Sequence, residues 1–231
     1  MLDTLGDFLN PYSDSIGAIA GAATTLHSVS KIVFLNGIRK RGTADGYSAA
    51  PFLGSLVIII LNIKLSFILK DTALFRTHVF GIIINIAFIS IFYYYTSKQS
   101  RPKIWKQFAI AVIFATICII YTNLEDPAKI ESRFGILLSM LYLVLLGAPL
   151  LGMKNIIRKK SAENLPFPMI LTGTMIVTLW LMYGISIKER VIIGQNILLL
   201  LLLSPQLIVC LIYPRTPSIT KPLDDKTLKQ E

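Results

Sequence analysis

The feature that most constrains this chain is a series of long apolar blocks, each with few charges, separated by short polar segments. The hydrocarbon core of a bilayer is about 30 Å thick, and roughly 20 apolar residues cross it as a helix. The blocks therefore predict membrane-spanning helices, the fourth being short enough to serve as a linker helix. Seven blocks are found: Ser15–Leu35, Tyr47–Leu69, Leu74–Tyr95, Trp105–Tyr121, Phe134–Met153, Phe167–Ile187 and Val191–Tyr213.

The composition excludes an ordinary soluble enzyme and a disordered chain. Hydrophobic residues make up 54% of the 231 residues and charged residues 16%, whereas soluble domains are about 45–50% apolar and about 25% charged. Disorder requires low hydrophobicity. Cys118 and Cys210 both lie inside apolar blocks, so no disulfide framework or metal-ligand spacing is predicted. Motifs for ATP binding or hydrolysis are not found, so we expect no enzyme and no cofactor.

The distribution of basic residues predicts the orientation of the chain. The net charge is +10, which by itself would suggest nucleic acid. However, fifteen of the 23 Lys and Arg residues follow the first, third, fifth and seventh blocks, and six lie on the other side. Because excess Lys and Arg marks cytoplasmic loops, we expect the N-terminus outside or in a lumen and the C-terminus in the cytosol. No nucleic-acid partner is expected.

Two basic loops reveal an internal repeat with an offset of 118 residues. Aligning Thr43 with Ser161 also pairs Asp45 with Glu163. The predicted fold is therefore an all-α membrane protein with seven transmembrane helices, built as a 3+1+3 parallel repeat of three-helix bundles. Such repeats place a solute site between the halves near the membrane midplane. The predicted regions are an outer N-terminus (1–14), a first repeat (15–95), a linker-helix region (96–123), a second repeat (134–213) and a disordered cytosolic tail (214–231).

The same offset pairs four candidate site residues, Asn62 with Trp180 and His78 with Asn196. Polar residues within spans usually face the bundle interior, and an amide both donates and accepts hydrogen bonds. These residues fit a small polar solute, with the indole as an apolar wall. Other interpretations stay open: Asn62 and Asn196 as helix-packing groups, and His78 and Trp180 as groups at the membrane interface.

Three segments of the second half resemble the SWEET sugar-transporter family, and the first loop, RKRGTADG, resembles its animal members. The segments are GAPLLGMKNIIRKKSAENLPF, TLWLMYG and QNILLLLLLSPQLIVCLIYP. The resemblance runs from about Gly17 to Pro214. It implies a central pocket with a pair of asparagines and apolar or Trp walls, so Asn196 and Trp180 become substrate-binding residues. In the first half, His78 stands in the asparagine position and Asn62 in the wall position.

The resemblance also implies gate hinges at prolines near the cytoplasmic ends of spans. Pro51, Pro149 and Pro166 occupy such positions, whereas the first-span position falls near Lys31. The alternative for Pro51 and Pro166 is a helix start, because proline is favoured in the first turn. Pro149, inside the fifth block, is the stronger candidate for a kink.

The function predicted from these features is facilitative, bidirectional transport of mono- or disaccharide sugars by alternating access. Acidic residues are absent from the predicted spans, and proton-coupled carriers usually need such groups. The alternatives are a carrier of another small solute, such as an amino acid, and a non-transporting seven-span receptor or scaffold. The expected partners are a sugar and membrane lipid, with the plasma membrane favoured over the Golgi or another endomembrane; a homo-oligomer stays an open alternative.

Overall fold

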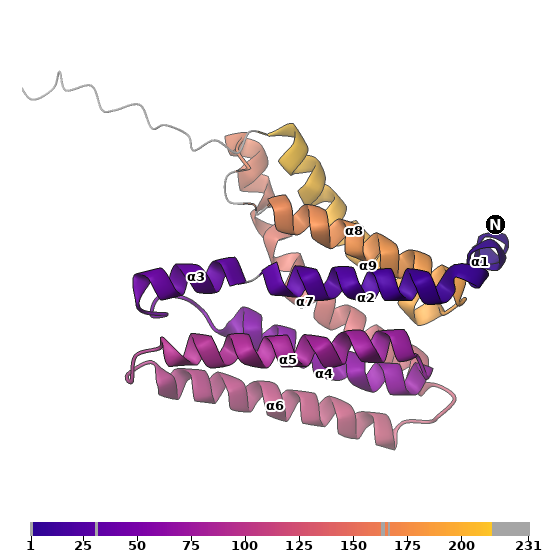
Figure 1. Ribbon diagram of the computed structural model, residues 1–231, viewed down its shortest axis with the longest axis horizontal. Helices are drawn as coiled ribbons and strands as arrows, with labels where there is room; N and C mark the ends of the chain where they lie inside the picture. The colour runs from indigo at the N-terminus through magenta and orange to yellow at the C-terminus, as the bar shows by residue number, and fades with distance from the viewer. Residues whose placement is uncertain (1, 31, 163–164, 166, 214–231) are drawn as a thin grey trace, which may run out of the picture.

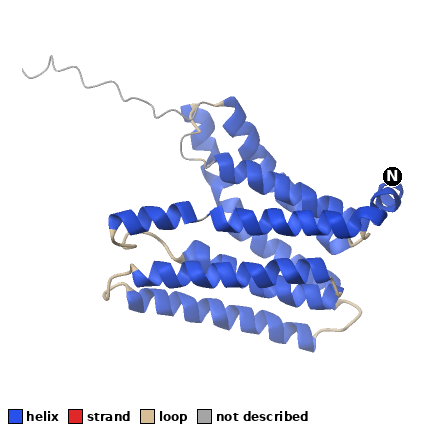
Figure 2. Ribbon diagram, viewed as in Figure 1, coloured by secondary structure: helices blue, strands red, loops and turns tan. Residues whose placement is uncertain are grey.

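The computed structural model describes residues 2–30, 32–162, 165 and 167–213. These residues form helices and loops, with no strand among them (Figure 2). Seven helical segments in the described part are long and apolar enough to cross a membrane. The all-helical, seven-span prediction is confirmed. The elements are α1 (Leu2–Leu9), the 3-10 helix η1 (Asn10–Tyr12), α2 (Ser13–Ser30), α3 (Ile32–Arg41), α4 (Ala50–Leu69), α5 (Thr72–Tyr94), α6 (Arg101–Leu124), α7 (Ile130–Lys159), α8 (Phe167–Ser186) and α9 (Arg190–Ile212).

Three elements differ from the sequence-based expectation. The fourth span is not short: α6 has 24 residues, which at 1.5 Å per residue is about 36 Å and exceeds the bilayer core. The fifth span, α7, has 30 residues and includes charged residues at both ends. The apolar block ends at those charged residues, but the helical hydrogen bonds of the backbone continue through them. The N-terminal segment, for which no helix was predicted, forms α1 and η1.

The helices form two bundles with matching order (Figure 1). In the first half, α2–α5, the third span α5 packs between α2 and α4. In the second half, α7–α9, the last span α9 packs between α7 and α8. Between the halves, α2 packs against α8 and α4 packs against α7. The two contacts are equivalent under the repeat, since each joins the first span of one half to the second span of the other.

The repeat is also present in the backbone of the turns. Lys70 and Lys188, 118 residues apart, both adopt the left-handed conformation, with φ of 54° and 57°. The residue after each lysine caps the next helix: the side chain of Asp71 accepts a hydrogen bond from the Leu74 amide, and that of Glu189 from the Val191 amide. Such capping satisfies amide groups that have no partner within the helix. The two halves therefore share their turn chemistry as well as their helix order.

The buried cores differ between the two ends of the molecule. We call the end with α1 and the turns at Lys70 and Lys188 the α1 end, and the end with the last turn of α3 and the loop 42–49 the α3 end. A core that reaches the α1 end joins both halves and α6, with members such as Leu61, Phe134 and Trp180. At the α3 end each half has a core of its own. The halves are thus held together at the α1 end.

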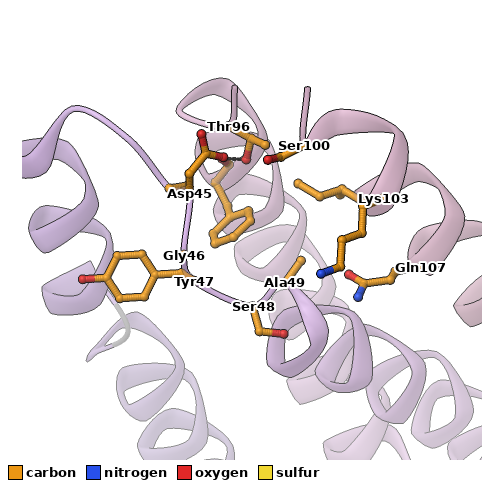
Figure 3. A pocket seen from close by; sticks show the side chains of 12 residues that line it. Asp45, Gly46, Tyr47, Ser48, Ala49, Thr96, Ser100, Lys103 and Gln107 are labelled. Carbon is orange, nitrogen blue, oxygen red and sulfur yellow. Dashed lines mark hydrogen bonds between the residues drawn. The ribbon is translucent and has the colours of Figure 1, made fainter. Parts of the chain in front are cut away.

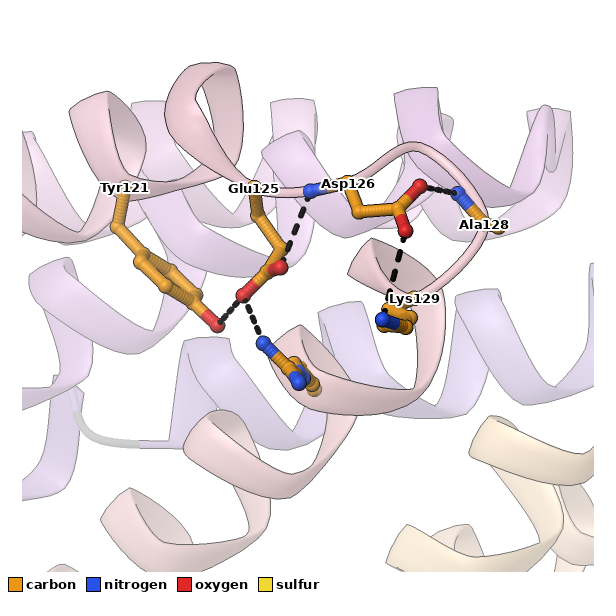
Figure 4. Close-up of polar contacts among 6 residues, drawn as sticks. Tyr121, Glu125, Asp126, Ala128 and Lys129 are labelled. Atoms are coloured by element: carbon orange, nitrogen blue, oxygen red, sulfur yellow. Dashed lines mark hydrogen bonds and ion pairs between the residues drawn. The ribbon is translucent and has the colours of Figure 1, made fainter.

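A polar cluster fixes the connection between α6 and α7 (Figure 4). Glu125, which follows α6, accepts hydrogen bonds from the Tyr121 hydroxyl and from the Arg133 guanidinium, each at 2.6 Å. It also accepts from the Asp126 amide at 3.0 Å. These hydrogen bonds, with that of Tyr121 the largest cause, lower the pKa of Glu125 to about 2. The carboxylate therefore stays ionised and ties α6 to the start of α7.

Candidate functional site between the two halves

Asn62 lies on α4 at the contact between the two halves. It is 2% exposed. Its Nδ2 donates to the Ile58 carbonyl at 2.8 Å and to the Tyr142 hydroxyl, on α7, at 2.9 Å. The second bond crosses from the first half to the second. The helix-packing interpretation of Asn62 is therefore realised in this conformation, with Tyr142 as the partner.

Trp180 lies on α8 and makes a corresponding bond in the opposite direction. Its Nε1 donates to the Thr24 hydroxyl, on α2, at 2.9 Å. The indole is buried and meets the Tyr183 ring edge-to-face at a centroid distance of 5.5 Å. Trp180 thus lies inside the protein, which argues against the alternative of a membrane-interface belt.

These two hydrogen bonds are equivalent under the 118-residue repeat. Asn62 corresponds to Trp180, and Thr24 corresponds to Tyr142. Each bond joins the second span of one half to the first span of the other. The four side chains therefore form a twofold-like set at the interface of the halves, and we call them the bridging set.

The other predicted pair, His78 and Asn196, lies on the third spans of the halves. Asn196 is buried in α9, and its Nδ2 donates to the Ile192 carbonyl of its own helix at 2.8 Å. His78 is half-buried on α5, and within the described part of the chain it has no hydrogen bond. Among the described residues, no hydrogen bond joins this pair to the bridging set, so its membership of a common site stays a prediction.

Two further ties cross between the halves. At the α1 end, the Tyr183 hydroxyl, on α8, donates to Asp71 Oδ2 at 2.8 Å, while Asp71 Oδ1 accepts from the Leu74 amide at 2.7 Å. Nearer the α3 end, His27 Nδ1, on α2, lies 2.8 Å from the Thr172 hydroxyl, on α8. The Asp71–Tyr183 bond is buried and joins a turn of the first half to the second half.

The predicted hinge prolines have different positions in the helices. Pro51 lies in the first turn of α4, as expected if it serves as a helix start. Pro149 lies within α7, a position typical of a kink. Pro166 lies outside the described residues, so its role stays a prediction. Their action as gate hinges is likewise untested.

Sequence reasoning missed three polar residues. Thr24 and Tyr142 were not selected, although they are 118 residues apart and so occupy equivalent positions in the repeat. Asn85, on α5, is also buried, and its Oδ1 has no hydrogen-bond partner in the described part of the chain. No group of three or more His, Cys, Asp or Glu residues among those described is arranged to hold a metal ion.

Comparisons with known proteins agree with this architecture. Residues 132–218 match the family described as "Sugar efflux transporter for intercellular exchange". The sugar transporter SWEET1 of Drosophila pseudoobscura pseudoobscura is 28% identical over 77% of this chain and 78% of its own length. The bidirectional sugar transporter SWEET10 of Arabidopsis thaliana is 28% identical over 77% of this chain and 63% of its own length. The predicted resemblance to the SWEET family is confirmed.

A solved structure of a eukaryotic SWEET transporter has the same fold. It superposes with a TM-score of 0.72 and covers 85% of this chain and 96% of its own, at 21% sequence identity. The 3+1+3 arrangement predicted from the repeat is therefore confirmed as a SWEET fold. The relatives are named as transporters, which agrees with the prediction that this SWEET-like chain is not an enzyme.

Proposed function

We propose that this SWEET-like chain carries mono- or disaccharide sugars across a membrane by facilitative, bidirectional transport with alternating access. The bridging set is the observation that supports the proposal most. Each of its hydrogen bonds joins the halves through a hydroxyl, and a sugar supplies hydroxyls of the same kind. A bound sugar can exchange with Thr24 or Tyr142 as the partner of the Trp180 Nε1 or the Asn62 amide. Asn196 and His78 are proposed as further contacts.

The distribution of cores supports alternating access. The halves share a buried core toward the α1 end and have separate cores at the α3 end. Separation at the α3 end therefore disturbs no common core, whereas opening at the α1 end requires the shared core to part. A sugar shifts the balance between two such states only by binding one of them more tightly.

The location of the acidic residues supports uncoupled movement. Inside the helices α2 to α9, the acidic residues are Asp14 and Glu131, both exposed in the first turn of a helix. The buried carboxylate of Asp71 lies outside the helices, in the turn before α5 at the α1 end. Proton-coupled carriers usually place such groups in the bundle interior. We therefore expect flux to follow the sugar gradient and to be insensitive to a protonophore.

The proposal is tested by uptake of radiolabelled hexose into vesicles that contain the purified chain. Asn196→Ala removes the buried amide and should reduce uptake at least tenfold, because a lost polar contact of about 1.4 kcal/mol changes binding tenfold. The matched control is Ile197→Ala, which changes the next, exposed residue of α9 and should leave uptake unchanged. Equal uptake by both variants would remove Asn196 from the site.

A competition panel separates the alternatives. Sugars should inhibit uptake and amino acids should not. Competition by amino acids with no effect of sugars would show a carrier of another solute. A purified, folded chain that moves neither class would show a receptor or scaffold.

We also propose the orientation that the basic residues predict, with the N-terminus outside or in a lumen and the C-terminus cytosolic. The α3 end, which carries the basic residues Arg39, Lys40 and Arg41 in the last turn of α3, then faces the cytosol. A glycosylation acceptor inserted in the loop 125–129 should be modified, since that loop lies at the α1 end, whereas an acceptor in the loop 42–49 should not. Plasma membrane is the favoured location, and the oligomeric state stays a prediction to be tested by mass measurement in detergent.

A further inference from the structure

A cavity of about 260 Å³ lies at the α3 end, away from the contact between the halves. Its walls are the loop that precedes α4, the end of α5 and the first turns of α6 (Figure 3). All of these belong to the first half or to the linker helix. The cavity is therefore separate from the proposed sugar site, and its role does not depend on transport.

One side of this cavity is cationic. Lys103 and Gln107, one turn apart on α6, lie together on one side of it, near Ser48 (Figure 3). Within the part of the chain that the structure describes, no carboxylate lies within ion-pair distance of the Lys103 ammonium group. The cavity therefore offers an uncompensated positive charge beside neutral hydrogen-bonding groups.

The acidic residue of the lining lies on the opposite side. Asp45 Oδ1 accepts a hydrogen bond from the Ser97 amide at 3.4 Å, and the carboxylate lies near Thr96 and Ser100 in Figure 3. Hydrogen bonds, with the Ser97 side chain the largest cause, lower the pKa of Asp45. A ligand that fits must therefore place an anion at Lys103 and hydrogen-bond donors, such as hydroxyls, at Asp45.

The surroundings place the cavity at the level of lipid headgroups. Trp105 and Tyr94, on the helices that form its walls, are 58% and 75% exposed. Exposed Trp and Tyr side chains gather where the bilayer meets water. Arg101, next to Ser100 of the lining, adds positive charge at the same end of α6, and anionic lipid attracts basic groups at the cytoplasmic surface.

We propose that this cavity binds the phosphorylated, hydroxyl-rich headgroup of an anionic membrane lipid, of which phosphatidylinositol is the type. The phosphate contacts Lys103, and the ring hydroxyls contact Asp45, Ser48 and Gln107. The bound headgroup joins the loop before α4 to α6 and so fixes the linker helix to the first half.

The test measures thermal unfolding of the purified full-length chain in nanodiscs of phosphatidylcholine, with or without an equal fraction of phosphatidylinositol or phosphatidylserine. Phosphatidylinositol should raise the unfolding temperature more than phosphatidylserine, which carries the net charge without the ring hydroxyls. Lys103→Gln should weaken the response to phosphatidylinositol about tenfold in the lipid fraction needed, because a charge-assisted hydrogen bond is lost. Lys106→Gln, a change of an exposed lysine outside the lining on the same helix, should retain it.

Several results would overturn the proposal. They are an undiminished response of Lys103→Gln, an equal loss in Lys106→Gln, or an equal effect of phosphatidylserine. Stabilisation by inorganic phosphate in phosphatidylcholine alone would assign the site to a free anion instead of a lipid. If Lys103→Gln does not fold, Ser48→Ala and Lys103→Arg replace it: the first should weaken the response and the second should retain it, and the reverse pattern contradicts the assignment.

Discussion

At the scale of single residues, the side chains between the halves combine hydrogen bonding with apolar surface. Trp180 shows both, since its Nε1 is bonded to Thr24 while its ring lies among buried side chains. Asn62 provides hydrogen bonds and no apolar face. The repeat has therefore placed different chemistry at equivalent positions, and each position needs its own test.

Trp180→Phe separates the two properties of the indole. Phenylalanine keeps an aromatic face and loses the donor to Thr24. If the face stacks on the sugar ring, Trp180→Phe should retain most hexose uptake, whereas Trp180→Leu should raise the KM about tenfold, because aromatic contacts contribute about 0.5–1.5 kcal/mol beyond area burial. The measurement is the concentration dependence of uptake. Equal losses in both variants would mean that the hydrogen bond to Thr24 is the important contact.

Glu125 gives a prediction about pH. Its pKa is lowered to about 2 in the folded protein, against about 4.3 in an unfolded chain. A lowered pKa stabilises the folded state at pH values above the unfolded pKa, and this contribution is lost as the pH falls through the folded pKa. Thermal unfolding of Glu125→Gln should therefore differ from the parent by a constant amount between pH 5 and 8, and the difference should shrink below about pH 4.

The control for this measurement is Lys129→Gln. It breaks an exposed ion pair with Asp126, at 3.6 Å, and such pairs contribute little to stability. A Glu125→Gln difference that varies between pH 5 and 8 would contradict the role given to the cluster.

At the scale of helices, small residues set how closely α2 approaches its neighbours. A Cβ atom added at Gly17 would lie 2.8 Å from the Tyr183 ring and 3.1 Å from the Ala73 side chain. Both distances are shorter than van der Waals contact, so α2 would have to move away from α5 and α8. The composition of the first span, rich in glycine and alanine, is explained by this close packing.

Gly17→Ala should therefore destabilise the protein by about 1–3 kcal/mol, the usual cost of overpacking. The measurement is thermal or denaturant unfolding in detergent. Gly37→Ala is the matched control, since a Cβ at Gly37, on α3, has no atom within 4 Å. A Gly17→Ala variant as stable as Gly37→Ala would show that α2 can shift without cost.

The number and order of the helices and the repeat could be predicted from the sequence, because hydropathy and loop similarity depend on consecutive residues and not on tertiary contacts. Helix ends could not, since Lys159 and Glu131 continue α7 beyond its apolar block. Asn62 and Trp180, predicted as site residues, lie at the contact of the halves, and their role in substrate binding stays a prediction. The partners Thr24 and Tyr142 were missed because their residue types carry no signal without the contact. For His78, the rotation of α5 decides which groups surround it, and periodicity does not define that rotation.

At the scale of the whole molecule, the two ends differ in how the halves are joined. The buried Asp71–Tyr183 bond lies at the α1 end together with the shared core. Hydrogen bonds to charged groups contribute about 1.5–3 kcal/mol, which corresponds to a change of about ten- to a hundredfold in a population. Under the proposed alternating access, a bond of this strength is sufficient to shift the balance between the two open states.

Tyr183→Phe removes this bond and should shift the population toward the state that is open at the α1 end. Hydrogen exchange of the turn at Asp71 should become faster, and hexose uptake should change in rate without loss of binding. Tyr94→Phe, a change of an exposed tyrosine at the α3 end, should alter neither. Unchanged exchange in Tyr183→Phe would show that the shared core, rather than the bond, closes this end.

The linker helix has a consequence for any movement of the halves. α6 packs along α4 and adds its residues to the first-half core, while the second half, as far as the structure describes it (to residue 213), has no corresponding fourth helix. The two halves therefore share the order of their helices, but they differ in mass and in the perimeter that faces lipid. A rocking motion in the bilayer would displace unequal amounts of lipid on the two sides, so changes in bilayer thickness or lateral pressure should affect the two directions of transport to different degrees.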